Sequence, residues 1–326
     1  MKLHEYNDAF EGAIIAAAEF FGIPQVYIEK DYWVTYALRQ IFTDEKARHL
    51  AVFKGGTSLS KCYGIIDRFS EDIDIVVFQE TNESGYALKK KLKTVTNSVG
   101  DALQYVPEHP MENKKGKIRK LIYDYQKAGV SGNFGQVRDQ IAIEVSSLGN
   151  TDPYQELEIH SMITEFIAAK NNTDLINTYA LEPFKVKVLA MERTFCEKII
   201  SLVRFSYDEN PVQSLSNKIR HTYDLHQMLQ SDKIQRFLSS NDFEIMLQQV
   251  GKDDLKAIPN DKQWLESHPS ESLFFKKLPA IWSEGLKNTY SGSFKDLVTG
   301  EFPEEQKVLE SLETIKSEIL NIEWIN

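Results

Sequence analysis

Several features that classify proteins are scarce or missing in this chain of 326 residues. It has only two cysteines, Cys62 and Cys196, without Cys-x-x-Cys spacing, and both fall in apolar helical contexts. We therefore expect core thiols in a reducing compartment. No apolar run approaches the roughly 20 residues that cross a bilayer, and the N-terminus lacks a charged-then-apolar signal. These absences predict a cytoplasmic protein with no membrane partner.

Positive charge is also in short supply. The chain carries 48 Asp and Glu against 38 Lys and Arg, a formal net charge of −10. This balance argues against a protein that coats nucleic acid, because such binding depends on neutralising phosphates. It leaves open an enzyme that engages RNA through one basic patch. With 42% hydrophobic residues, the chain is typical of folded globular proteins and has room for two domains.

Two common nucleotide-binding motifs are absent, namely the Walker P-loop and the Gly-x-Gly-x-x-Gly fingerprint. The sequence instead has an apolar strand, residues 50–53, that runs into two glycines and a short helix opened by two hydroxyls. Glycines let main-chain N–H groups approach a phosphate, and a helix N-terminus adds partial positive charge. The candidate phosphate-binding residues are Gly55, Gly56, Thr57, Ser58 and Lys61.

A pair of aspartates follows on the next predicted strand. Asp72 and Asp74 alternate with Ile73 and Ile75, so both carboxylates share one face while the apolar side chains face a core. Paired carboxylates suit Mg²⁺ that bridges to nucleotide phosphates. Asp-x-Asp alone also occurs in solvated turns and in glycosyltransferases, and Gly-Gly alone is usually a turn. The ordered combination of the two favours nucleotidyl transfer.

The same residues carry a resemblance to a known family. The run of residues 53–61, followed by residues 68–75, resembles the first signature of the AbiEii/AbiGii toxin nucleotidyltransferases, a branch of the DNA polymerase β-like superfamily. Residues 28–35 are similar to the leading helix of that family. Residues 193–199 and 219–225 resemble its later signatures, in the expected order. The resemblance spans roughly residues 25 to 230.

The resemblance implies a fold and an activity. The fold is α+β, with a mixed-sheet nucleotidyltransferase domain flanked by helices at residues 1–190. An α-helical domain at residues 191–326 would complete the active-site cleft. The activity is Mg²⁺-dependent transfer of an NMP from an NTP to an acceptor, expected to be the 3′ end of an RNA such as tRNA. The biology is that of a toxin in a toxin–antitoxin or phage-defence system, with a cognate antitoxin as a possible partner.

The resemblance also implies that a third carboxylate on a neighbouring strand completes a site for two Mg²⁺ ions. Residues 140–146 form a predicted strand on which Glu144 faces away from the apolar side chains. Glu144 is therefore the candidate third ligand beside Asp72 and Asp74. A strand glutamate is more often a surface residue, and Asp139, just before the strand, is the competing candidate.

Two further residues take roles from the resemblance. Lys198 lies beside an apolar helical stripe and would bind phosphate, whereas Asp224 would serve catalysis or orient that lysine. Without the resemblance, Lys198 would snorkel to water and Asp224 would pair with Arg220 one turn away. Three other functions stay open: a protein-modifying nucleotidyltransferase, a glycosyltransferase, and a non-catalytic binding module on the same fold.

The remaining pattern predicts mostly helices. We expect helices at residues 5–22, 24–43 and 83–105, a turn near residues 150–154, and a helical, aromatic-rich core after residue 231. Lys30 and Asp31 are interpreted as a solvated helix face. The basic stretch of residues 114–120 leads into Tyr123 and Tyr125; such clusters are usually a solvated loop, and the alternative is a stacking surface for single-stranded RNA.

Overall fold

The structure is a computed structural model that describes residues 1–70, 72–130, 138–257 and 263–324. The chain forms two compact units that interleave along the sequence. Unit 1 consists of Met1–Cys62, Phe69–Ser147 and Tyr154–Val188. Unit 2 consists of Tyr63–Arg68, Leu148–Pro153 and Leu189–Asn326.

Unit 1 is built from one sheet and the helices around it. Its helices are α1 (Asn7–Phe21), α2 (Gln25–Thr43), α3 (Gly55–Lys61), α4 (Gly85–Asn97), α5 (Met162–Ala169) and α6 (Thr173–Thr178), with short turns η1 (Leu3–Glu5) and η2 (Ala47–His49). Its strands are β1 (Ala51–Lys54), β2 (Ile73–Val77), β3 (Leu103–Tyr105), β4 (Ile118–Tyr125), β5 (Ile141–Ser146), β6 (Tyr154–Ile159) and β7 (Phe184–Leu189).

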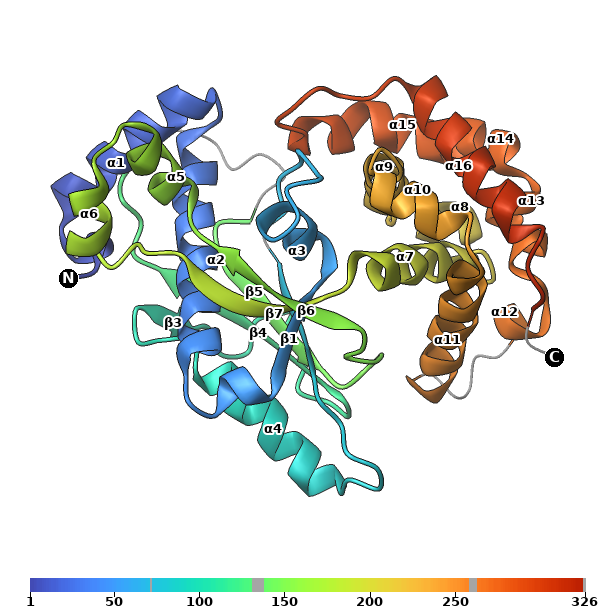
Figure 1. Cartoon of the computed structure of the whole chain (residues 1–326), viewed down its shortest axis with the longest axis horizontal. Helices are drawn as coiled ribbons and strands as arrows, with labels where there is room; N and C mark the ends of the chain where they lie inside the picture. Colours follow the sequence, from blue (N-terminus) through green and yellow to red (C-terminus); the bar gives the residue numbers. More distant parts are fainter. Residues whose placement is uncertain (71, 131–137, 258–262, 325–326) are drawn as a thin grey trace. The chain divides into compact units, whose positions relative to one another are not determined.

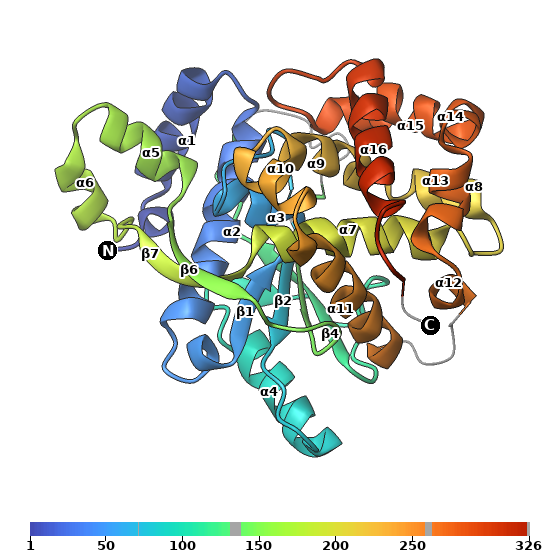
Figure 2. The same cartoon turned by 45° about the vertical axis from the view of Figure 1, so that its right-hand side comes forward.

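The strands form one mixed sheet in the order β3-β4-β5-β2-β1-β7-β6 (Figure 1). β1 pairs antiparallel with β2 and parallel with β7, and β2 pairs parallel with β5. Figures 1 and 2 show α1, α5 and α6 gathered beside α2, while α4 packs on β4 and β5. The α+β class with a mixed sheet is confirmed.

Two elements near the ends of the sheet differ from expectation. The helix predicted for residues 83–105 ends at Asn97, and residues 103–105 form β3 against β4. Between them Gly100 has φ +90°, and a Cβ there would lie 2.6 Å from the Tyr36 Oη. This left-handed φ is not helical, and glycine is suited to both the conformation and the close approach, so the chain turns here between α4 and β3. Residue 154, predicted as part of a turn, instead begins β6.

Helix α2 is buried on most of its surface, and the prediction of a solvated face at Lys30 is wrong. Lys30 is 0% exposed, and its ammonium donates to the main-chain carbonyls of Arg138 and Gln140. Its neighbour Glu29 accepts a hydrogen bond from Ala128 N at 2.6 Å. These main-chain groups replace water around the charges, which makes the burial tolerable.

The tyrosines of β4 are buried as well, so their interpretation as an RNA-stacking surface is wrong. Tyr123 and Tyr125 are each 4% exposed. Tyr123 donates to the main-chain oxygen of Thr96 at 2.8 Å, and Tyr125 stacks on Trp33 of α2 with 5.4 Å between ring centroids. The strand alternation was identified correctly, but the face it defines is the one that α4 and α2 cover.

Unit 2 is almost entirely helical. Its longer helices are α7 (Met191–Phe205), α8 (Pro211–Ser216), α9 (Ile219–Leu229), α10 (Asp232–Leu238), α11 (Asn241–Ala257) and α16 (Glu305–Ile319). Between α11 and α16 lie α12 (Gln263–Glu266), η3 (Pro269–Glu271), α13 (Leu273–Lys276), α14 (Leu278–Ile281), η4 (Trp282–Leu286), α15 (Lys287–Thr289), η5 (Tyr290–Phe294) and η6 (Lys295–Leu297).

The core of unit 2 follows the predicted apolar pattern. α7 packs against α11 and α9, and α16 lies along α9 (Figure 2). The α7 stripe of Phe195, Ile199 and Leu202 is fully buried. The aromatic residues after residue 231 that were expected in the core are buried too, namely Trp264, Phe274, Phe275 and Trp282.

In the described part of the chain, no single helix is both long and apolar enough to cross a bilayer. α1 and α2 satisfy both criteria only when taken together, and they are bent by 114° at the break between them.

Two neighbouring aspartates of α11 provide a test of how unit 2 is held together. Asp253 accepts from Arg193 Nη2 at 2.8 Å with both side chains buried, whereas Asp254 accepts from Arg204 Nη1 at 2.7 Å with both about one fifth exposed. Asp253→Ala removes the nearer of the two carboxylates paired with the buried Arg193 and leaves it only Glu197, 3.4 Å from its Nε, so we expect a loss of about 3 kcal/mol in the free energy of unfolding. Asp254→Ala should cost less than about 1 kcal/mol. Urea unfolding measures both, and equal losses would contradict this interpretation.

Candidate active site

The turn between β1 and α3 is shaped by contact with an aspartate. Gly55 has φ +82°, and a Cβ on it would lie 2.3 Å from Asp74 Oδ2. Only glycine combines this left-handed conformation with such a close approach. The predicted glycine turn is therefore present, and it lies directly against one of the two predicted carboxylates.

The two hydroxyls after the glycines form hydrogen bonds within unit 1. α3 begins at Gly55, and no side chain caps its N-terminus. Thr57 Oγ1 instead donates to the main-chain oxygen of Asp72 at 2.5 Å and lies 2.9 Å from Ser70 Oγ. Ser58 Oγ donates to Gly55 O at 2.8 Å. Thr57 thus fastens the segment before β2 to α3 and fixes where the Asp72 backbone lies.

Lys61, at the end of α3, has partners within the protein. Its ammonium lies 2.6 Å from Asp31 Oδ1 and donates to His160 O at 2.7 Å. Asp31 Oδ2 also accepts from Met162 N at 2.7 Å. Both charged side chains are about nine-tenths buried, so the expectation of a solvated Asp31 is wrong. The pair ties α3 to α2 and to the start of α5.

A row of four charged residues crosses the middle of the sheet. Lys54 on β1 is in register with Asp74 on β2, Asp74 with Glu144 on β5, and Glu144 with Lys120 on β4. Residues in register project from the same face, so two carboxylates are neighbours with a lysine at each end. Lys120 Nζ lies 3.6 Å from Glu144 Oε2. Asp139, the competing candidate, is exposed and lies outside the strand.

Asp72 precedes β2 by one residue and joins this acidic group. Its carboxylate forms an ion pair with Arg138, and its charge acts on Asp74. Burial, together with the charges of Asp72 and Glu144, raises the pKa of Asp74 to about 7, against the opposing effect of Lys54 and Lys120. Asp74 as a whole is only partly buried, but its Oδ2 lies close against Gly55.

These oxygen donors are of the type that Mg²⁺ prefers. Asp74 and Glu144 are neighbours across two strands, and their mutual repulsion is the kind of strain that a bound divalent cation relieves. Among the described residues, no group of three acidic, histidine or cysteine side chains is already arranged to enclose a metal. The carboxylate oxygens of Asp74 and Glu144 are ligands that fit a divalent cation. The Asp72 carboxylate, by contrast, is paired with Arg138.

A second charged cluster lies in unit 2. Arg68 forms a two-pronged ion pair with Asp224 of α9, with Nε at 2.6 Å from Oδ1 and Nη2 at 2.7 Å from Oδ2. Lys198 of α7 donates to the same Oδ2 at 2.6 Å. All three side chains are at most 6% exposed. Asp224 is therefore held by these two cations, and Lys198 does not snorkel to water.

Electrostatics in this cluster favour a charged carboxylate. Burial alone would raise the pKa of Asp224, but the charges of Arg68 and Lys198 outweigh burial and hold it well below its usual range. Two cations thus share one ionised carboxylate. Such a cluster is suited to orienting a lysine or to receiving an anion.

Arg68 is the residue that the sequence analysis missed. It opens the motif that contains Asp72 and Asp74, but its segment belongs to unit 2, where Thr299 N donates to Asp67 O at 2.7 Å. Its position at the head of the signature was the only available signal. Glu71 of the same motif lies outside the described residues.

The predicted site residues thus form two sets. The glycine turn, Lys61 and the three carboxylates belong to unit 1, and Lys198 and Asp224 belong to unit 2. Several neighbouring carboxylates beside a glycine turn on a mixed sheet are typical of enzymes that transfer a nucleotidyl or phosphoryl group. Comparison with known families agrees with this class: the profile of "Nucleotidyl transferase AbiEii toxin, Type IV TA system" matches residues 36–310. The chain belongs to this family of nucleotidyltransferase toxins, for which an NTP substrate and an antitoxin are implied.

More distant similarities connect the chain to two solved structures. MenT4, a nucleotidyltransferase toxin from Mycobacterium tuberculosis H37Rv, matches with 16% sequence identity and a TM-score of 0.44, covering 93% of this chain and 94% of that one. JHP933 from Helicobacter pylori matches with 14% identity and a TM-score of 0.40, covering 90% and 93%. At these identities, neither structure indicates the substrate of this chain or the roles of its residues. No curated protein sequence matches significantly.

The raised pKa of Asp74 predicts how stability depends on pH in metal-free buffer. Between about pH 4 and pH 7 the unfolded chain has lost this proton while the folded chain keeps it, so folding becomes less favourable as pH rises. Asp74→Asn should therefore raise the free energy of unfolding by about 1–2 kcal/mol at pH 8, with the gain shrinking toward zero near pH 4. Urea unfolding across this range measures the gain. Asp139→Asn is the exposed control, and a pH-independent difference for Asp74→Asn would contradict the prediction.

The cluster in unit 2 predicts unequal effects of removing its members. Asp224→Asn leaves two buried cations without their carboxylate, so we expect a loss of about 3 kcal/mol or more in the free energy of unfolding at pH 7. Lys198→Met should cost less, because Arg68 keeps its two-pronged contact with Asp224. Thermal and urea unfolding of both variants provide the comparison, and a larger loss for Lys198→Met would show that the cluster is held differently.

Proposed function

We propose that this protein transfers an NMP from an NTP to the 3′ end of an RNA, with tRNA as the acceptor, in a Mg²⁺-dependent reaction. This activity would make it the toxin of a toxin–antitoxin or phage-defence system. The observation that supports the chemistry is the placement of Asp74 beside Glu144 and near Asp72, with a pKa raised by burial and by their like charges. Family membership supports the donor, an NTP.

In this proposal the carboxylates of unit 1 are the metal ligands. Asp72, Asp74 and Glu144 would hold two Mg²⁺ ions, and Asp72 would exchange its contact with Arg138 for this role. When bound, the ions would supply positive charge to the attacking hydroxyl and to the pyrophosphate leaving group. Lys54 and Lys120, at the two ends of the row, partly offset the effects that raise the pKa of Asp74.

The glycine turn would bind the triphosphate. The hydroxyls of Thr57 and Ser58 are engaged inside the protein, so binding would use main-chain N–H groups of Gly55, Gly56 and the two residues that follow. These groups lie in the first turn of α3, where helical N–H groups have no partner within the helix. Lys61 would add positive charge while its ammonium stays on Asp31.

Lys198 and Asp224 complete the proposed catalytic set and bring residues 191–326 into the reaction. Lys198 would balance the negative charge that develops on the phosphates, and Asp224 would orient it. Their 2.6 Å contact and their burial support this assignment of roles. Arg68 would act as a positioning residue, because it holds the Asp224 carboxylate from the other side.

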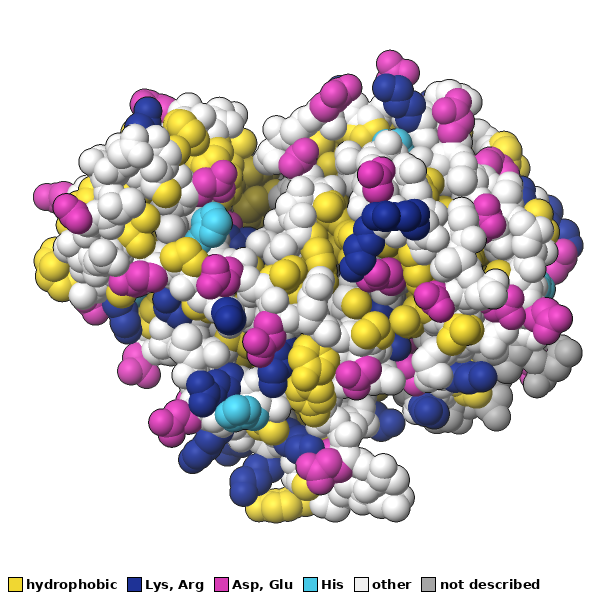
Figure 3. Space-filling view, in the orientation of Figure 1, with side chains coloured by type: hydrophobic (Ala, Val, Ile, Leu, Met, Phe, Trp, Pro, Cys, Tyr) yellow, Lys and Arg dark blue, Asp and Glu magenta, His cyan; other side chains and the backbone are white. Residues whose placement is uncertain are grey.

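The RNA acceptor is supported by a local excess of basic side chains in an acidic chain. Figure 3 shows Lys and Arg gathered over the part of unit 1 around α4. The exposed lysines there and before β4 are Lys89, Lys90, Lys93, Lys114, Lys115 and Lys117. Such a patch attracts a phosphate backbone despite the net charge of −10.

Labelling with radioactive nucleotides tests the proposal. The protein is incubated with total bacterial tRNA, Mg²⁺ and each α-³²P-labelled NTP in turn, and label on RNA is measured. We expect labelling with at least one NTP, and a loss of about 100-fold or more in Asp74→Asn. Asp139→Asn removes the same charge from an exposed site and should keep full activity.

The products separate the alternatives. Label on protein in place of RNA would indicate a protein-modifying nucleotidyltransferase. No label on any acceptor, together with no NTP binding, would overturn the proposed enzyme function. Label that persists in Asp74→Asn would overturn the assigned metal ligands but leave the transferase activity.

A further inference from the structure

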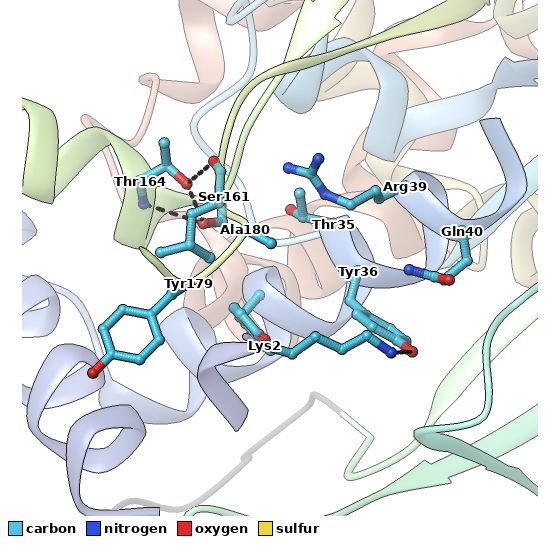
Figure 4. Close-up of a pocket in the computed structure, with 11 residues that line it drawn as sticks. Lys2, Thr35, Tyr36, Arg39, Gln40, Ser161, Thr164, Tyr179 and Ala180 are labelled. Atoms are coloured by element: carbon cyan, nitrogen blue, oxygen red, sulfur yellow. Dashed lines mark hydrogen bonds between the residues drawn. The ribbon is translucent and has the colours of Figure 1, made fainter. Parts of the chain in front are cut away.

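A cavity of about 150 Å³ opens in unit 1, away from the carboxylate row (Figure 4). One wall is the side of α2 that carries Thr35, Tyr36 and Arg39. Lys2 lies at one side, and the opposite wall is formed by Ser161, Thr164 and residues 179–181. The cavity is well below the roughly 300–1,000 Å³ of sites for drug-sized ligands, so it is too small for an NTP. It matches a molecule with one ring or a short chain.

The charge of this cavity is opposite to that of the chain. Among the described residues that line it, two are cationic, Lys2 and Arg39, and none is Asp or Glu. The whole chain has ten more acidic than basic residues. The hydroxyl-bearing residues Thr35, Tyr36 and Ser161 also line the cavity, although the Thr35 hydroxyl donates to Asp31 O and the Ser161 hydroxyl pairs with Thr164. This combination of cations and hydroxyl donors is complementary to an anion.

Arg39 is the central group of the cavity. Its guanidinium donates to Glu182 O and lies over the Phe184 ring, 4.5 Å from the centroid. In the described part of the chain it forms no ion pair with a carboxylate. Burial lowers the pKa of Arg39. The charges of Glu182 and Tyr32 act in the opposite direction but do not cancel the effect of burial. A partly buried guanidinium with unused donors gains from a bound anion, because its planar fork matches two oxygens of a carboxylate or phosphate.

Lys2 supplies the second cation. Its ammonium lies 3.4 Å from Tyr36 Oη and 5.3 Å from the centroid of the same ring. It has no carboxylate partner in the described part of the chain. Figure 4 shows Lys2 extended along Tyr36. Ala180 and Leu181 line the cavity together with the tyrosine rings, so an apolar body would find contacts there.

We propose that this cavity binds a small organic anion, with its charged head on Arg39 and Lys2 and its apolar body against Leu181 and the tyrosine rings. The head is a carboxylate or a phosphate monoester, both of which accept two hydrogen bonds from one guanidinium. This site is separate from the proposed nucleotide site and does not depend on the proposed function.

Three small probes test the proposal on the full chain. Benzoate and phenyl phosphate carry the two candidate head groups on one ring, and benzyl alcohol is the uncharged analogue. Binding is measured by saturation-transfer NMR titration. We expect millimolar or tighter binding of at least one anion and at least about tenfold weaker binding of benzyl alcohol. The tighter of the two anions identifies the head group.

Variants locate the site. Arg39→Gln should weaken anion binding about tenfold or more, and Lys2→Ala should weaken it several-fold. Lys2 lies near the chain terminus, so Lys2→Ala remains informative if Arg39→Gln fails to fold in circular dichroism. The matched control, Arg236→Gln, removes an exposed arginine of α10 and should bind like the unmodified protein. The proposal would be overturned if neither anion bound, if benzyl alcohol bound equally well, or if Arg236→Gln lost binding to the same extent.

Discussion

The repulsion between neighbouring carboxylates at the centre of the sheet is the constraint on which the candidate site depends. Asp74 and Glu144 are in register on adjacent strands, with Lys54 and Lys120 at the two ends of the row. The lysines offset part of the repulsion, but the pKa of Asp74 stays near 7. A sheet keeps such an arrangement only because the strand pairing fixes it, so the repulsion remains in the folded state.

Buried charges elsewhere in the chain join segments that are distant in the sequence. Lys30 holds the carbonyls of Arg138 and Gln140, and Asp31 joins Lys61 to the start of α5. In unit 2, Asp224 joins α9 to α7 and to the Arg68 segment. Each buried ion is satisfied by a partner or by main-chain groups, as burial requires. Each of these contacts fixes the position of the segments that it joins within one unit.

Local pattern was sufficient for much of the fold. Strand alternation predicted β2 and β5 and the side of β5 that carries Glu144, and helical periodicity predicted α1, α2, α7 and the buried stripe of α7. It failed where a tertiary partner decided burial. Tyr123 and Tyr125 were placed on one face correctly, but only the packing of α4 and α2 shows that this face is covered. The prediction of a solvated helix face at Lys30 was wrong for the same reason.

The sequence by itself determined the family, the glycine turn, the paired aspartates and the α+β class, because these depend on residue type and short-range spacing. The tertiary structure alone decided which residues meet. It placed Gly55 against Asp74, gave Glu144 rather than Asp139 the position beside Asp74, and brought Arg68 to Asp224 across 156 positions. Such pairings depend on strand register and on helix packing, which no local pattern in one sequence encodes.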